Sequence, residues 1–301
     1  MTLQQLRQVL TIAESNSMNE AAKKLFVSQP NLSATVREVE EELGITVFMR
    51  NNRGITVTAE GEEFLGYAKQ VVEQYHLLEN RYLNVESKKK FSVSMQHYSF
   101  AVKAFVQLAK EVGMDEYEFA VHETKTKEVI DNVKNLKSEI GVLYLSDFNE
   151  KVLRKLFKEC DIEFKDLFTC NTYVYLWKKH PLAGKKVITL DDLQEYPCLT
   201  FEQGVNNSFY YAEEMMSTYE YKRVIKADDR ATMLNLMVGL NGFTLCSGII
   251  SEDLNGDDYA AIPLKESEKM HIGYIKHKGT KLSKLGEIYI DALKNYENKV
   301  L

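Results

Sequence analysis

The stretch of sequence that decides the fold of the first part of the chain runs from Ser17 to Gly44 and reads SMNEAAKKLFVSQPNLSATVREVEEELG. Ser17 precedes Glu20 by three residues, a capping-box spacing that predicts the start of a short helix. Ser28 predicts the N-cap of a second helix, with Pro30 in its first turn, where a missing N–H costs little. Gly44 predicts a left-handed cap that ends this helix. The stretch therefore predicts two helices joined by a tight connector.

The second predicted helix has one apolar face and one polar face. Its apolar residues are spaced 4, 3 and 4 apart and form a buried stripe of Leu32, Val36, Val39 and Leu43. A helix of this kind, after a short helix and a tight turn, is the helix-turn-helix arrangement, whose second helix enters the major groove of DNA. The compact polar and basic residues near its start are therefore predicted DNA contacts: Ser28, Gln29, Pro30, Asn31, Ser33 and Arg37.

The segments on either side of this stretch complete a small domain. Apolar residues recur at helical spacing over residues 3–14, which predicts a preceding amphipathic helix. Residues 45–48 and 55–57 are strand-like and flank a turn, which predicts a β-hairpin wing. Arg50 and Arg53 lie at the base and tip of this wing, where arginine pairs with phosphates or enters the minor groove. These two arginines join the predicted DNA contacts.

The first sixty residues resemble the N-terminal domain of LysR-type transcriptional regulators. The resemblance is carried by Ala21-Ala22-x-x-Leu25-x-x-Ser28-Gln29-Pro30-x-Leu32-Ser33, by Glu40-x-x-Leu43-Gly44-x-x-Val47-Phe48-x-Arg50, and by Val57-Thr58-x-x-Gly61. Val39 and Val47 stand where the family usually has leucine, but both remain apolar. The resemblance implies a winged helix-turn-helix domain over residues 1–58 that binds double-stranded operator DNA. The alternative is a small helical bundle without a DNA role. Residues 1–58 contain equal numbers of basic and acidic residues, which predicts modest non-specific affinity for DNA.

A long helix is predicted next, over residues 59–88, with Thr58 as its cap. Its apolar residues alternate in spacings of 4 and 3 and form a heptad seam of Phe64, Ala68, Val71, Tyr75, Leu78, Tyr82 and Val85. Such a seam must be buried, so we predict a coiled-coil helix that joins two copies of the chain. The same linker helix is implied by the resemblance. The alternative is a long helix packed on its own chain.

The whole-chain composition narrows the class of protein. The chain has 301 residues, of which 45% are hydrophobic and 27% charged, and this balance predicts about two folded domains. A net charge of −6 excludes a uniformly basic nucleic-acid coat but not a local contact surface. No apolar run approaches the ~18 residues that span a bilayer, and the N-terminus has no secretory pattern, so we expect a cytoplasmic protein without a membrane partner. The four cysteines show no Cys-x-x-Cys spacing, which predicts reduced, packed thiols and no metal site.

Strands alternate with helices from residue 91 onward. Strands are predicted at 91–95, 117–121 and 140–145, and helices at 100–112, 126–136 and 152–157, which is the rhythm of a parallel sheet covered by helices. Further strands are predicted at 162–168, 172–177, 198–201, 243–246 and 270–276. Further helices are predicted at 190–193, 209–216, 231–238 and 282–296.

The second part of the chain also resembles LysR-type regulators, through His180-Pro181-Leu182-Ala183, Ile188-Thr189-Leu190-x-x-Leu193 and Gly239-x-x-Gly242. The expected fold class is therefore α/β, with an N-terminal winged helix-turn-helix and a C-terminal pair of α/β subdomains like those of periplasmic binding proteins. The resemblance implies an effector-binding domain over 91–301. Its first subdomain would comprise 91–161 plus 267–301, and its second 162–266.

In such a fold a ligand lies at strand ends and helix N-termini. Three segments fit that position and supply the candidate effector-binding residues Gln96, Tyr98, Ser99, Thr124, Thr126, Thr200, Phe201 and Gln203. Helix N-termini with hydroxyl groups favour a small anion such as a carboxylate. Each polar residue has the alternative of being an ordinary helix cap. Glu123 would repel an anion, and Lys125 could offset it.

Sequence signals for catalysis are lacking. The chain has no phosphate loop, no Gly-x-Ser-x-Gly elbow and no histidines at metal-ligand spacing, although His97 and His122 fall near the predicted cleft. We therefore expect a regulator and not an enzyme, with no cofactor and a small-molecule co-inducer of unknown identity. Its expected partners are operator DNA, the effector, itself as a homodimer or homotetramer, and RNA polymerase. The alternatives are a small-ligand-binding protein with a non-functional DNA-binding head, and an unrecognised enzyme in the α/β half.

Overall fold

The computed structural model describes residues 1–15, 17–51, 54–82, 88–113, 116–206, 208–250 and 252–297. The chain divides into two compact units, Met1–Ser87 and Lys88–Leu301. Each unit has its own buried cores, so each is described by itself.

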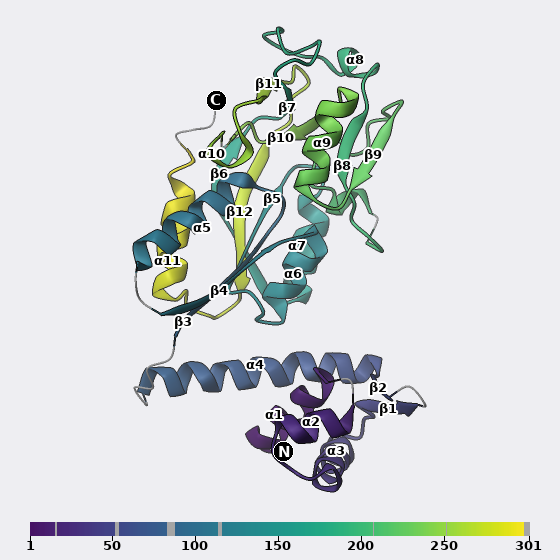
Figure 1. Ribbon diagram of the computed structural model, residues 1–301, viewed down its shortest axis with the longest axis vertical. Helices are drawn as coiled ribbons and strands as arrows, with labels where there is room; N and C mark the ends of the chain where they lie inside the picture. Colours follow the sequence, from purple (N-terminus) through teal and green to yellow (C-terminus); the bar gives the residue numbers. More distant parts are fainter. Residues whose placement is uncertain are drawn as a thin grey trace. The chain divides into compact units, whose positions relative to one another are not determined.

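The first unit contains the predicted helices and the wing. In chain order its elements are α1 (Leu3–Ala13), α2 (Met18–Lys24), α3 (Gln29–Leu43), β1 (Phe48–Asn51), β2 (Gly54–Val57) and α4 (Ala59–Tyr82) (Figure 1). Ser17 Oγ accepts a hydrogen bond from the Glu20 N–H at 3.2 Å, which confirms the predicted start of α2. Gly44 ends α3 with φ of 70°, the predicted left-handed cap.

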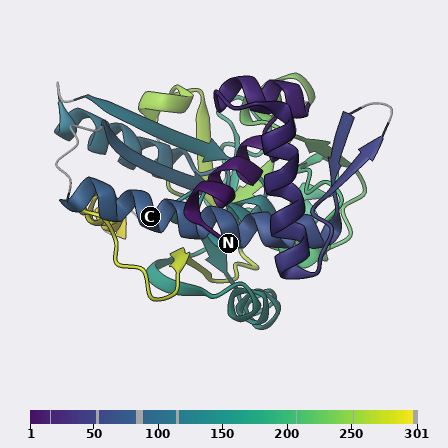
Figure 2. The same cartoon turned by 90° about the horizontal axis from the view of Figure 1, so that it is seen from below.

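The wing begins later than the sequence pattern indicates. Residues 45–47 were expected in the first strand, but β1 starts at Phe48 and pairs with β2 in an antiparallel hairpin that projects from the helices (Figure 2). The reason is a side-chain contact, because Glu40 Oε1 accepts hydrogen bonds from the Val47 and Phe48 N–H groups at 2.7 and 3.0 Å. These N–H groups are thereby tied to α3 at the base of the wing.

Part of the predicted heptad seam of α4 packs on its own chain. Leu6 of α1 forms a buried cluster with Ala68 and Val72. The aromatic ring of Tyr75 lies under the Arg7 guanidinium, at 5.3 Å from its centroid. The alternative of packing on the same chain therefore holds for this face.

A second face of α4 is apolar and exposed. Tyr67, Val71 and Leu78 are 60%, 51% and 54% exposed in the single chain. The exposed stripe contains Val71 and Leu78 of the predicted seam and also Tyr67, which the seam did not include. Val85 and the side chain of Tyr82, which the seam included, lie outside the described residues.

The first sheet of the second unit has five strands in the order β4 (Tyr117–Glu123), β3 (Lys89–Met95), β5 (Ile140–Leu145), β12 (Met270–His277) and β6 (Ile162–Cys170). Strand β3 is parallel to β4 and β5, as expected, whereas β12 is antiparallel to β5 and β6. Helices α5 (Ser99–Val112) and α11 (Lys284–Lys294) cover one face, and α6 (Thr126–Lys134) and α7 (Glu150–Glu159) cover the other (Figure 1). Alternate residues of β5 enter the cores on its two faces.

The expected crossing between subdomains near residue 162 is wrong. Strand β6 belongs to the first sheet, because residues 162–170 pair with the whole of β12 from Met270 to His277. The chain leaves this sheet only after Cys170 and returns with β12. The first subdomain is thus longer at this boundary than the sequence pattern indicates.

The second subdomain is built from short elements. Strands β10 (Thr244–Cys246), β7 (Tyr173–Trp177) and β11 (Tyr259–Pro263) form an antiparallel sheet, and β8 (Cys198–Phe201) pairs in parallel with β9 (Val224–Ala227). Its helices are α8 (Leu190–Leu193), α9 (Arg230–Leu240) and α10 (Glu252–Asn255). The sequence pattern did not predict β9, β11 or α10, each of which has five residues or fewer.

The predicted helix at 209–216 is also wrong. Only a 3₁₀ turn forms there, at Phe209–Tyr211, and Met216 has φ of 56°. Backbone groups beyond this turn bond to distant side chains instead, since the Ala212 carbonyl accepts from the Tyr144 hydroxyl at 3.0 Å. Tertiary hydrogen bonds therefore override the local helical pattern.

Two further features concern the described residues as a whole. No helix among them has the length and apolarity to cross a membrane, and no group of three His, Cys, Asp or Glu side chains there could hold a metal ion.

All four cysteines are free thiols, and burial raises the pKa of Cys170 and Cys246 to about 12.

Candidate functional site

The start of α3 presents the predicted DNA contacts. Ser28 Oγ accepts from the Asn31 N–H at 3.4 Å and so caps the helix. The Gln29 Nε2 amide donates to Ser33 Oγ at 2.9 Å, which places both side chains on one face of α3. The exposed residues of the set are Ser28, Pro30, Asn31 and Arg37. Arg53 and the side chain of Arg50 lie outside the described residues.

Three of the four acidic side chains of α3 bond within the first unit. Glu38 accepts from the Gln5 amide at 2.9 Å, and Glu42 pairs with the N-terminal amine at 2.5 Å. Glu40 holds the wing, as described above. These three charges are directed to α1, to the N-terminus and to the wing base. The first turn of α3 itself contains no acidic residue.

Phe26 was not among the predicted contacts. It lies in the connector between α2 and α3 with φ of 53°, and its side chain is 95% exposed. An exposed aromatic ring beside the start of α3 is a further candidate contact. The sequence pattern could not single it out, because an apolar residue in a short connector is normally buried.

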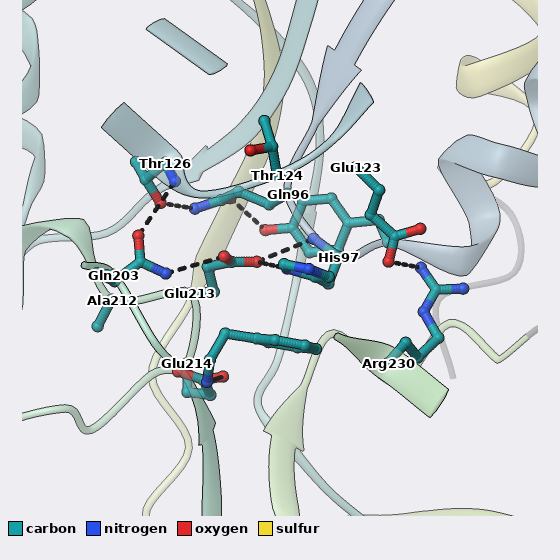
Figure 3. Close-up of polar contacts among 12 residues, drawn as sticks. Gln96, His97, Glu123, Thr124, Thr126, Gln203, Ala212, Glu213, Glu214 and Arg230 are labelled. Carbon is teal, nitrogen blue, oxygen red and sulfur yellow. Dashed lines mark hydrogen bonds and ion pairs between the residues drawn. The ribbon is translucent and has the colours of Figure 1, made fainter. Parts of the chain in front are cut away.

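The cleft of the second unit is organised around Gln96, which follows β3 (Figure 3). Gln96 Nε2 donates to Thr126 Oγ1 at 2.5 Å, and its Oε1 accepts from the Tyr98 hydroxyl at 2.9 Å and the Tyr144 N–H at 3.2 Å. Gln96 is only 1% exposed. Because Gln96 is buried and bonded to all three residues, it holds Thr126, Tyr98 and Tyr144 in place.

Thr126 and Gln203 connect the two subdomains at the start of α6. The Thr126 N–H donates to Gln203 Oε1 at 3.1 Å, and Thr126 Oγ1 donates to the Tyr211 carbonyl at 2.7 Å. The Gln203 Nε2 amide donates in turn to Glu213 Oε1 at 2.9 Å (Figure 3). This chain of bonds leads from the first subdomain to a buried carboxylate.

Glu213 lies at the centre of the cleft. Its Oε2 accepts from the His97 N–H at 2.9 Å and lies 2.8 Å from His97 Nδ1. The imidazole stacks on Phe201 with ring centroids 3.7 Å apart and planes within 6°. The side chains of His97 and Glu213 are 6% and 4% exposed, so this contact is shielded from solvent.

The adjacent Glu214 side chain is also buried, but it has a different hydrogen-bond donor from those of Glu213. Its Oε1 accepts from the Phe201 N–H at 2.9 Å. Burial, together with the neighbouring charge of Glu213, raises the pKa of the Glu214 carboxyl to about 8. At neutral pH the Glu214 carboxyl therefore mainly retains its proton. The side chain that faces the donors of the cleft is that of Glu213.

Two cavities adjoin this network. One of about 90 Å³ is bordered by His97, Ser99 and Glu213 and has an apolar wall that includes Met233 and Met237. The other, of about 450 Å³, is lined in part by Thr200, Phe201, Gln203 and Glu214. Thr244 Oγ1, also at the first cavity, is buried without a hydrogen-bond partner.

The structure therefore brings together most of the predicted effector residues. Gln96, Tyr98, Thr126, Phe201 and Gln203 share one network, while Ser99 and Thr200 line the cavities. Thr124 and His122 line neither of these two cavities, and the Thr124 hydroxyl donates to the side chain of Glu128 one turn later.

Glu123 and Lys125 both form ion pairs with residues of the second subdomain. Glu123 pairs with Arg230 of α9 at 2.7 Å, whereas Lys125 pairs with Asp228 at 3.2 Å. Arg230, Tyr144, Glu213 and Glu214 were all missed as cleft residues. They come from segments far along the chain, and the only signal for the two glutamates is an acidic pair inside an otherwise apolar stretch.

Comparisons with known proteins agree over nearly the whole chain. Residues 3–62 match the model of the bacterial regulatory helix-turn-helix protein, lysR family, and residues 113–297 match that of the LysR substrate binding domain. The HTH-type transcriptional regulator CysL of Bacillus subtilis is 24% identical, over 98% of both chains. The regulator BsdA of the same organism is 26% identical over 79% of this chain and 80% of its own length.

Solved structures show the same fold. A full-length OxyR variant from Pseudomonas aeruginosa matches with a TM-score of 0.70 at 19% identity, covering 98% of this chain and 95% of that one. CbnR in complex with its target DNA matches with a TM-score of 0.60 at 17% identity, covering 98% and 99%. The two family models correspond to the helix-turn-helix unit and the α/β unit of the structure. The chain therefore belongs to the LysR family of DNA-binding transcriptional regulators, which are not enzymes.

Proposed function

We propose that this regulator binds a dyad operator as a homo-oligomer, and that a small anionic effector in the cleft alters the relative setting of the DNA-binding units. The proposal of operator binding rests on the start of α3, where polar and basic side chains are exposed on a helix capped by Ser28. Helix N-termini and compact polar groups are suited to phosphates and base edges in the major groove. The proposed DNA contacts are Ser28, Gln29, Pro30, Asn31, Ser33, Arg37, Arg50 and Arg53.

The exposed face of α4 supports self-association. Tyr67, Val71 and Leu78 are each at least half exposed, and they lie within a helix of 24 residues, or ~36 Å. A second copy of α4 would remove this apolar area from water. A dimer would also place two recognition helices on two half-sites. Further association into a tetramer, contact with RNA polymerase and action in the cytoplasm belong to the same proposal.

The donors of the cleft support an anionic effector. The His97 N–H and the Gln203 amide both donate to a carboxylate in this structure, and Ser99, Thr200 and Phe201 line the adjoining cavities. An effector that prefers one setting of the subdomains would shift operator affinity. By linkage, operator DNA would shift effector affinity by the same factor.

The test is a nuclease footprint on the DNA upstream of the gene that encodes this chain, with scrambled DNA as a control and at two salt concentrations. We expect a protected dyad that persists when the salt concentration is raised. Protection that is absent, or equal on scrambled DNA, would contradict the operator assignment at this locus. A small-ligand-binding protein with a non-functional DNA-binding head would then fit the data better.

A further inference from the structure

We propose that the Glu213 carboxylate is an internal ligand, which occupies the carboxylate-binding position of the cleft, and that a free small carboxylate binds there by displacing it. This inference rests on the proposed function, since it concerns the same cleft. It adds that the chain supplies its own occupant of the site. An effector must therefore compete with a side chain, and not simply enter an open pocket.

The first ground is the set of donors around Glu213. Its two oxygens meet the His97 N–H, His97 Nδ1 and the Gln203 amide at 2.8–2.9 Å (Figure 3). A backbone N–H, an imidazole and a carboxamide together make the kind of charge-assisted site that recognises a ligand carboxylate. Gln203 is itself only 7% exposed and is held by the Thr126 N–H, so the site is built by buried groups.

The second ground is the position of Glu213 in the chain. Glu213 belongs to no helix or strand, and it lies between the 3₁₀ turn Phe209–Tyr211 and Met216, whose φ is 56°. Local hydrogen-bonded structure therefore does not hold Glu213 in place. The segment is fixed by tertiary contacts, such as that of the Tyr144 hydroxyl with the Ala212 carbonyl at 3.0 Å. Displacing Glu213 would not require a helix or a strand to unfold.

The third ground is the space next to the carboxylate. The cavity of about 90 Å³ borders both Glu213 and His97 and has an apolar wall that includes Met233, Met237 and Leu245. A ligand whose carboxylate replaced that of Glu213 could place a small apolar body against this wall. The chemical class that fits is therefore a short monocarboxylic acid.

Removal of the internal carboxylate tests the proposal directly. In the full chain, Glu213→Ala should create a vacancy that acetate or propionate fills. We expect the apparent affinity for propionate, from isothermal titration calorimetry and thermal shift, to be tighter than in the wild type by about tenfold or more, because the competing side chain is gone. Propionamide and sodium chloride at equal concentration should not stabilise the variant. Glu111→Ala, at an exposed position of α5 that lines neither cavity, is the control and should behave as the wild type.

A second variant keeps the test decisive if the alanine protein does not fold. Glu213→Gln preserves size but weakens the contact with the donors, so propionate should again bind more tightly than to the wild type. If neither variant binds propionate better than the wild type does, Glu213 is only a structural contact and the proposal is overturned. Failure here is distinguishable from failure of the proposed function. The footprint uses the wild-type chain without carboxylate. A dyad can therefore be protected even if neither Glu213 variant binds propionate more tightly. Conversely, the variants can bind propionate more tightly even if no dyad is protected.

Discussion

At the scale of single residues, Glu214 links the free energy of unfolding to pH. Its pKa is raised from 4.5 to about 8, so the folded chain retains a proton that the unfolded chain releases. The contribution of Glu214 to the free energy of unfolding is therefore largest below pH 4.5 and is lost as the pH rises toward 8. Glu214→Gln should remove this decline, which at ~1.4 kcal/mol per pKa unit amounts to a few kcal/mol.

Denaturant unfolding followed by the fluorescence of Trp177, the single tryptophan, measures this effect between pH 5 and 8. Glu220→Gln is the control, because its carboxylate is exposed. Equal pH dependence of the wild type and Glu214→Gln would show that Glu214 ionises without a penalty in the folded protein.

Phe26 carries a backbone conformation that asparagine adopts more readily. With φ of 53°, a β-carbon costs ~1–2 kcal/mol, and asparagine offsets part of that cost by local hydrogen bonding. We expect Phe26→Asn to be more stable than Phe26→Ala by up to ~1 kcal/mol, because both lose the exposed ring but only alanine keeps the full strain. Thermal unfolding of the two variants gives the comparison. The reverse order of stability would contradict the strain, and weaker operator binding by both would make Phe26 a DNA contact.

Individual residues also show what a sequence can reveal about a site. Gln96, Thr126 and Gln203 were predicted because each follows a predicted strand, and a ligand in such a fold lies at strand ends and helix N-termini. Glu213 was not predicted, since it enters the cleft from an irregular segment whose course depends on contacts with Tyr144 and His97. Strand periodicity carries no information about such a segment.

At the scale of elements, the wing depends on one side chain of α3. Glu40 Oε1 accepts two backbone N–H groups at 2.7 and 3.0 Å, and Glu40→Ala leaves both without this partner. We expect a loss of ~1–3 kcal/mol in the stability of the first unit and weaker operator binding. Urea unfolding measured by circular dichroism tests this, with the exposed Glu41→Ala as the control. A stability equal to that of Glu41→Ala would mean that the wing is held by other contacts.

The exposed face of α4 yields a prediction about assembly. Leu78→Glu places a charge on a side chain that is 54% exposed in the single chain, so it should spare the fold but oppose burial between two copies. We expect a shift from dimer to monomer in sedimentation experiments, whereas Glu73→Gln, at another exposed position of α4, should remain a dimer. If Leu78→Glu stayed dimeric, the interface would lie elsewhere.

The elements differ in how far the sequence could predict them. Helix α3 was predicted residue for residue at its ends, because Ser28 and Gly44 cap it locally. The strand β6 was predicted, but its sheet was not, because that depends on pairing with β12 about a hundred residues later. The seam of α4 was predicted as one surface, whereas α1 covers part of it through Leu6.

At the scale of the whole molecule, the proposed regulator has a DNA-binding unit and an effector unit, and each has its own core. The cleft network joins the two subdomains of the effector unit through Thr126, Gln203 and Glu213. A ligand that replaces Glu213 would alter these contacts. It would thereby change which subdomain setting is favoured, and operator affinity would change with it.

The most direct test of the central claim is the dissociation constant for the footprinted operator and for a scrambled duplex, measured by fluorescence anisotropy at two salt concentrations. For the wild type we predict tighter binding to the operator, by about a thousandfold. For the double variant Gln29→Ala and Ser33→Ala we predict nearly equal binding to both duplexes with an unchanged salt dependence, since phosphate contacts remain. An undiminished preference of the double variant for the operator would contradict the assignment of α3 as the helix that reads the DNA sequence.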